Sequence, residues 1–131
     1  FTDTSRRTIW AYDYEAASGV ITNQRPFVRV PDDDGVPDGL TVDSEGGVWS
    51  AKWGGWKVTR YDPQGRIDRE VHLATQNVTS CAFGGVDLDE LYITTAQVGL
   101  SEHEQRDQPL AGDLFRTKVQ IRGLEEPAFA G

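Results

Sequence analysis

Apolar residues alternate with polar ones over short stretches of this chain, and β-branched and aromatic residues dominate those stretches. A period of two residues is typical of strands with one buried face. The pattern predicts strands at Thr8–Tyr14, Leu40–Asp43, Val48–Ala51, Lys57–Tyr61, Arg66–Leu73, Thr79–Phe83, Leu91–Thr95 and Asp113–Lys118. Since no stretch has an apolar stripe at helical spacing, we expect an all-β fold and assign the polar segment Ser101–Gln108 to a loop.

The predicted strands recur as units separated by glycine and proline turns. Asp38–Asp62 forms one unit, and Ser80–Arg116 forms the next, offset by about 40 residues. Thr8–Asp13 resembles the third strand of an earlier unit. Because this is the spacing of four-stranded propeller blades, the sequence predicts about three blades of a β-propeller. A β-sandwich, which also has short strands, is the alternative.

Three such units cannot close a ring, because propellers typically have about 4–8 blades. An open stack would expose unpaired strand edges and apolar sheet faces. We therefore expect the ring to be completed by a further part of the protein or by a second copy related by a two-fold axis. The sequence begins at Phe1 and contains no Met, which we interpret as a processed or partial start.

The composition narrows the choice of partners. A formal net charge of −8 with scattered acids argues against nucleic acid, because phosphate contacts need clustered Lys and Arg. No apolar run approaches the roughly 20 residues that cross a bilayer, and no intact signal peptide opens the chain, so we expect no membrane partner. The single cysteine, Cys81, cannot form an intramolecular disulfide, which favours a reducing compartment such as the cytoplasm.

Asp38, within Val36–Leu40, is the strongest candidate for chemistry. A carboxylate just before the first strand of a blade would lie at the central channel, where it could bind a hard divalent cation. Pro37 stiffens the approach, and Gly39 lets the backbone pass close to a ligand. A turn-forming Pro-Asp-Gly with a solvated carboxylate explains the same residues, and the pattern alone favours that second interpretation.

Other motifs for metal binding or hydrolysis are incomplete. Asp32–Gly35 lacks the alternating acids and the later Glu of an EF-hand loop. His72 and His103 lack the spacing of zinc ligands. The chain has no Gly-x-Ser-x-Gly elbow, so a hydrolase of that design is not expected.

The cysteine and the tryptophans could serve either to pack the core or to form a functional site. Cys81 lies on a predicted inner strand and is interpreted as an inert buried thiol. Trp49 is expected to pack between units. Trp53 and Trp56 flank the Gly54–Gly55 turn and could wall a pocket.

Read together, these residues resemble the C-terminal part of the regucalcin and gluconolactonase family of six-bladed β-propellers. The resemblance is carried, in order, by Phe1–Thr4, Trp10–Tyr14, Val36–Asp43, Gly46–Trp49, Val58–Gly65, Thr79–Gly85, Leu91–Ala96, Gly112–Phe115 and Phe129–Gly131. It implies that residues 1–131 are the C-terminal half of a single propeller domain.

The resemblance also implies a divalent-metal-dependent hydrolase that opens sugar lactones, gluconolactone-like substrates among them, to aldonic acids. Asp38 matches the family's metal-binding aspartate, and the resemblance gives it an expected part in proton transfer. The metal, which could be Ca, Zn, Mg or Mn, would polarise the lactone carbonyl. Ser80, at the equivalent position of the next unit, and Trp53 are expected to contact the substrate.

The chain departs from the family in one respect that bears on activity. The family's other metal ligands, a glutamate and an asparagine, have no counterpart here, and one carboxylate cannot fix a catalytic cation. The 131 residues alone are therefore expected to be inactive. Two further hypotheses stay open: a non-catalytic propeller fragment that serves as a binding or assembly module, and a relative acting on a different ester or lactone, including luciferin-related chemistry.

Overall fold

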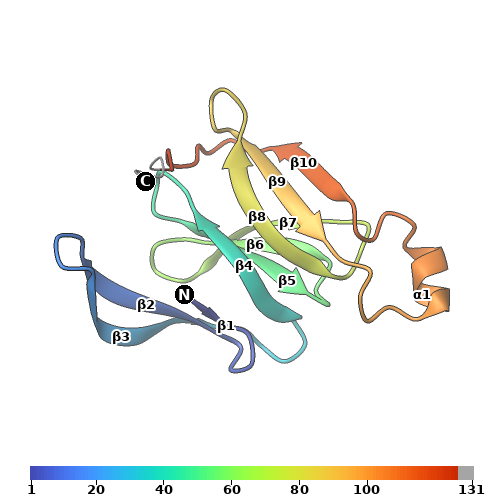
Figure 1. The fold of residues 1–131 in the computed structure, drawn as a ribbon, viewed down its shortest axis with the longest axis horizontal. Coiled ribbons are helices and arrows are strands. Elements are labelled where there is room, and N and C mark those ends of the chain that lie inside the picture. Colours follow the sequence, from blue (N-terminus) through green and yellow to red (C-terminus); the bar gives the residue numbers. More distant parts are fainter. Residues whose placement is uncertain (127–131) are drawn as a thin grey trace.

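The computed structural model describes residues 1–126, which form three antiparallel sheets and one short helix (Figure 1). The strands are β1 (Thr2–Asp3), β2 (Thr8–Glu15), β3 (Val20–Arg29), β4 (Val36–Val42), β5 (Val48–Trp53), β6 (Lys57–Tyr61), β7 (Ile67–His72), β8 (Val78–Gly84), β9 (Glu90–Thr95) and β10 (Leu114–Lys118). They are arranged as β1-β2-β3, β4-β5-β6-β7 and β10-β9-β8. The all-β prediction is thus confirmed, and three sheets rather than two argue against a sandwich. The motif Phe129–Gly131 lies outside the described residues.

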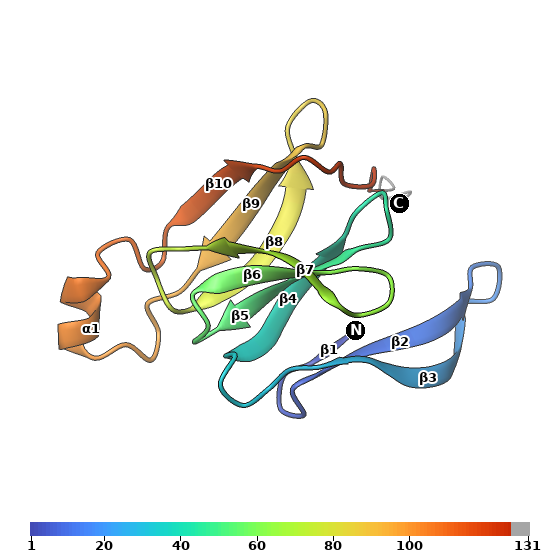
Figure 2. The ribbon, with the colours of Figure 1, turned by 180° about the vertical axis from the view of Figure 1, so that it is seen from behind.

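The four-stranded sheet lies between the other two, as the front and back views show (Figure 1 and Figure 2). On one side, Trp49 and Val58 pack in a core with Ile93 of the β8–β10 sheet. On the other side, Tyr61 packs in a second core with Ile9 of the β1–β3 sheet. Burial of both faces explains why nearly every residue of β5 and β6 is buried. This stacking of consecutive antiparallel sheets is consistent with part of a β-propeller.

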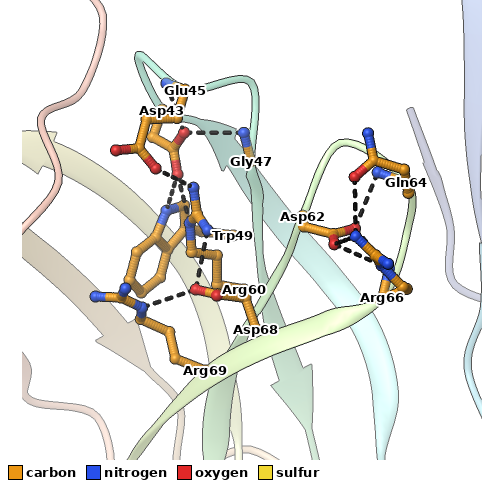
Figure 3. Close-up of polar contacts among 10 residues, drawn as sticks. All are labelled: Asp43, Glu45, Gly47, Trp49, Arg60, Asp62, Gln64, Arg66, Asp68 and Arg69. Carbon is orange, nitrogen blue, oxygen red and sulfur yellow. Dashed lines mark hydrogen bonds and ion pairs between the residues drawn. The ribbon is translucent and has the colours of Figure 1, made fainter.

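The turn between β4 and β5 is built around the buried carboxylate of Asp43 (Figure 3). Asp43 accepts hydrogen bonds of 2.8 Å from Trp49 Nε1, from Arg60 Nε and from the Gly47 amide. Burial alone would raise the pKa of Asp43, but these hydrogen bonds, with Arg60 the largest, outweigh it and lower the pKa. The network fixes the end of β4 that is remote from Asp38.

The sequence does not predict β1 and β3. Only two residues form β1, which is too few for a periodic pattern. β3 is exposed along most of its length and contains Pro26, so it lacks the apolar alternation of a half-buried strand. Its pairing with β2 also has register shifts, which break the alternation further.

The prediction of a loop at Ser101–Gln108 is wrong, because α1 (Glu102–Asp107) forms there. The Ser101 side chain accepts a hydrogen bond from the Glu104 amide, and the Glu104 carboxylate accepts one from the Ser101 amide. This capping box stabilises the helix start. No residue of α1 is buried, so the helix has no apolar stripe in the sequence. No helix among residues 1–126 is long and apolar enough to cross a bilayer.

Candidate functional site

Asp38 lies within β4, near its start, and not just before the strand as the sequence predicts. The strand begins early because Pro37 pairs with Lys52 of β5, after which the register shifts before Leu40. This irregularity is typical of bulges, which change the direction in which a side chain points. Asp38 is half-buried. The predicted residue is therefore on the strand itself, at an irregular position.

The Asp38 carboxyl lacks the charged partners that most acids in this chain have. Burial raises the pKa of Asp38, and the Gly39 amide opposes that rise. Among residues 1–126, no Lys or Arg side chain contributes to that pKa. By contrast, Asp43 and Asp34 each pair with a basic side chain. The uncompensated carboxylate of Asp38 is thus available to a cation.

Ser80 lies on β8, directly against the strand that carries Asp38. A Cβ atom placed on Gly39 would lie 2.3 Å from Ser80 Oγ and 2.8 Å from Ser80 Cα. Only glycine fits at position 39, because these distances are shorter than any normal contact. The Pro-Asp-Gly motif therefore brings β4 and β8 together, and it places two of the predicted site residues on adjacent strands.

Trp53 ends β5 at the same end of the sheet at which β4 begins. It pairs with Val36 across β4 and β5 and forms a bridge with Asn77 just before β8. A Cβ atom on Gly99, in the connection between β9 and β10, would lie 3.9 Å from the Trp53 ring. Trp53 is half-buried. Its indole thus lies among the loops at the end of the sheet where β4 begins, and its contact with a substrate stays a prediction.

The oxygen atoms of Asp38 and Ser80 are of the kind that binds a hard cation, but they are too few to hold one. Asp38 supplies carboxylate oxygens without a counter-charge, and Ser80 supplies a hydroxyl on the neighbouring strand. Residues 1–126 contain no group of three or more His, Cys, Asp or Glu side chains that could surround an ion. A divalent ion takes roughly six or more oxygen ligands in proteins. A divalent ion at this position would need further oxygen donors besides these two.

Several other sequence interpretations can be compared with the structure. Cys81 is buried, and burial raises the pKa of its thiol to about 12, as expected of an inert thiol. Trp49 is fully buried and makes an edge-to-face contact with Phe83, 5.9 Å between ring centroids, so its packing role is confirmed. Asp32 pairs with Arg7, and Asp34 pairs with two lysines, so neither acid resembles a free calcium ligand.

A buried charged cluster beside the start of β4 was not predicted. Lys52 is completely buried, and it shares Asp34 with Lys57. The sequence does hold a signal, because the Gly54–Gly55 turn pairs Lys52 with Lys57 across the hairpin. Two lysines directly opposite each other need an acid between them.

Comparison with known proteins supports the family resemblance that the sequence motifs indicate. Residues 1–97 match the family described as the SMP-30/Gluconolactonase/LRE-like region. The chain is 42% identical over 130 residues to the pentonolactonase XacC of Haloferax volcanii, covering 96% of this chain and 45% of that protein. It is 40% identical over 131 residues to the L-arabinolactonase of Azospirillum brasilense, covering 100% of this chain and 43% of that protein.

A solved structure supports the same relationship. Regucalcin from Agrobacterium tumefaciens strain C58, described as a calcium-binding protein, matches 97% of this chain with a TM-score of 0.91 and 29% identity. The match covers 43% of that structure, and the chain spans less than half the length of each of these relatives. Which half it corresponds to stays a prediction. The chain belongs to the SMP-30/gluconolactonase/LRE-like family.

Proposed function

We propose that this chain is the C-terminal half of a six-bladed β-propeller whose complete form hydrolyses sugar lactones with the help of one divalent metal ion. The observation that carries the proposal is the Asp38 carboxylate, which has no charged partner among residues 1–126 and lies where β4 meets β8. Relatives named pentonolactonase and L-arabinolactonase support the substrate class.

Each site residue has a distinct proposed role. Asp38 would hold the metal through a carboxylate oxygen and assist removal of a proton from the attacking water. Ser80 would line the substrate pocket with its hydroxyl, and Trp53 would form an apolar wall against the sugar ring. When bound, the metal would supply Lewis-acid polarisation of the lactone carbonyl; it could be calcium, zinc, magnesium or manganese.

The site requires more than these residues. One carboxylate and one hydroxyl fall short of the oxygen ligands that a divalent ion needs. The rest of the propeller, or a second copy of this segment, would supply the remaining ligands and close the ring. The isolated segment would therefore be inactive. A single, buried cysteine also fits a reducing compartment, and we place the complete protein in the cytoplasm.

The test uses the complete protein after removal of metal with a chelator. Release of acid from an aldonolactone at constant pH should depend on added divalent metal. Asp38→Asn should lower kcat/KM by more than about 100-fold, beyond the range typical of residues that only support a ligand. Asp62→Asn, at an exposed turn, is the matched control and should leave the rate unchanged. A folded protein with metal-independent hydrolysis, or with none, would refute the proposal.

A further inference from the structure

Lys52 is a charged side chain with no exposed surface. Its ammonium donates a 2.7 Å hydrogen bond to the Tyr61 hydroxyl and makes a 3.3 Å ion-pair contact with Asp34 Oδ2. Because Lys52 is sealed from solvent, it cannot touch a substrate. Any functional effect of Lys52 must pass through the groups that it holds.

Asp34 contacts both lysines of the cluster around Lys52. Its second carboxylate oxygen lies 2.6 Å from Lys57 Nζ, and Lys57 also lies 2.7 Å from Glu70 Oε1. Two lysines and two acids thus balance in charge. Buried ion pairs contribute little net stability compared with apolar packing, although the loss of one partner is costly. The cluster is therefore better suited to fixing a position than to stabilising the fold.

The position that the cluster fixes is the chain segment leading into Asp38. Asp34 lies four residues before Asp38 in the sequence, and Pro37 pairs directly with Lys52. Gly35, at φ 65°, packs so closely on the β5–β6 turn that a Cβ atom would lie 2.7 Å from the Gly55 amide nitrogen. The side-chain and backbone contacts of Lys52 therefore act on the same short segment.

Arg7 holds the same segment from the opposite sheet. Its guanidinium donates hydrogen bonds to the carbonyl groups of Val30, Pro31 and Gly35. The segment before β4 is consequently fastened to both neighbouring sheets. Connecting segments are usually more mobile than the elements that they join, and these contacts restrain this one.

We propose that the Lys52–Asp34–Lys57 cluster positions Asp38 for metal binding by fixing the backbone from Asp34 to Asp38. The proposal rests on the proposed metal-dependent function. In metal sites, groups that orient a ligand without touching the ion typically change metal affinity by about 10- to 100-fold. Asp34, Lys52 and Lys57 are thus positioning residues.

The experiment compares metal binding by the complete protein and its Asp34→Asn variant, which removes the charge and keeps the size. Calorimetric titration of the metal-free protein with manganese should give a Kd that is about 10- to 100-fold weaker in the variant. Hydrogen exchange of the metal-free protein should show faster exchange in residues 35–40, at every position except Pro37, which has no amide hydrogen. Lys57→Met should have the same two effects, and Lys57→Arg should restore both.

Asp68→Asn is the matched control, because Asp68 also pairs with a buried basic side chain, Arg60, but lies on β7 away from Asp38. It should lower the melting temperature and leave both the manganese Kd and exchange at residues 35–40 unchanged. Equal Kd values for Asp34→Asn, Lys57→Met and the unaltered protein would overturn the positioning role. If the unaltered protein binds no metal, the proposed function fails, and exchange at residues 35–40 then decides whether the cluster fixes this segment.

Discussion

Trp49 and Asp43 are joined by a 2.8 Å hydrogen bond from the indole Nε1 to Oδ2, in which both side chains are buried. The same carboxylate oxygen accepts a second hydrogen bond, from Arg60 Nε, at 2.8 Å. One aspartate therefore ties the β4–β5 turn to β5 and β6 (Figure 3). Because the indole also packs on Phe83 of β8, the polar network orients a residue of the larger core.

Asp43→Ala should destabilise the complete protein by about 3–5 kcal/mol, since it leaves the buried Arg60 guanidinium without its closest acid. Urea unfolding followed by tryptophan fluorescence measures this. Asp62→Ala removes a similar set of hydrogen bonds at an exposed turn and should change the unfolding free energy far less. Equal effects of the two substitutions would show that burial of the Asp43 network is unimportant.

The pH dependence of stability should reflect Asp43 as well. Its pKa in the folded state lies below the ordinary value of 3.8. The folded state then binds the proton less readily than the unfolded state, so the stabilisation is present above pH 3.8 and is lost as the pH falls toward the folded pKa. Unfolding free energies measured between pH 7 and pH 2 should fall below about pH 4. In Asp43→Asn that part of the decrease should disappear.

Gly39→Ala should destabilise the protein by about 1–3 kcal/mol, because the added methyl group would overlap Ser80 and force β4 from β8. It should also reduce metal affinity, since moving β4 away from β8 would displace Asp38, the residue before Gly39. Adding Ser80→Gly removes the overlap with Oγ and Cβ, but the 2.8 Å approach to Cα remains. The double variant should thus recover part of the loss. Full additivity in a double-mutant cycle would contradict direct contact.

Cys81 should resist modification in the folded protein. Its thiol is buried, and a pKa of about 12 leaves almost no thiolate at neutral pH. Reaction with a disulfide reagent should therefore be slow in buffer and complete in denaturing urea. Rapid modification of the folded protein would mean that the interface between the β4–β7 and β8–β10 sheets opens readily.

The sequence predicts those features of the fold and the site that depend on a local pattern or on a short motif. The strand β9 buries alternate residues, and β5 and β6 are short, mostly buried runs bounded by glycine and proline turns, so the positions of all three follow from local pattern. Asp38 was found through Pro37-Asp38-Gly39, but its place inside β4 was not, because the early start depends on pairing with Lys52. Whether Asp38 binds metal stays a prediction.

Features that depend on contacts between residues far apart in the chain could not be predicted from local sequence patterns. The hairpin pairs Lys52 with Lys57, but Asp34 joins them only after the segment before β4 folds onto the β5–β6 turn, and no local pattern encodes that approach. The exposed strand β3 and helix α1 have no buried periodicity to detect. For α1, the Ser101 and Glu104 capping pair was the available signal.

The central sheet, which supplies side chains to both cores, has a consequence for cooperativity. If β6 opened, both cores would lose their packing together, because Val58 belongs to one core and Tyr61 to the other. Amides of β6 should therefore exchange only when the whole unit unfolds. The helix α1, which buries nothing, can open by itself at little cost. Slow exchange in the middle and fast exchange at α1 would make the central sheet the part on which the folding of both neighbours depends.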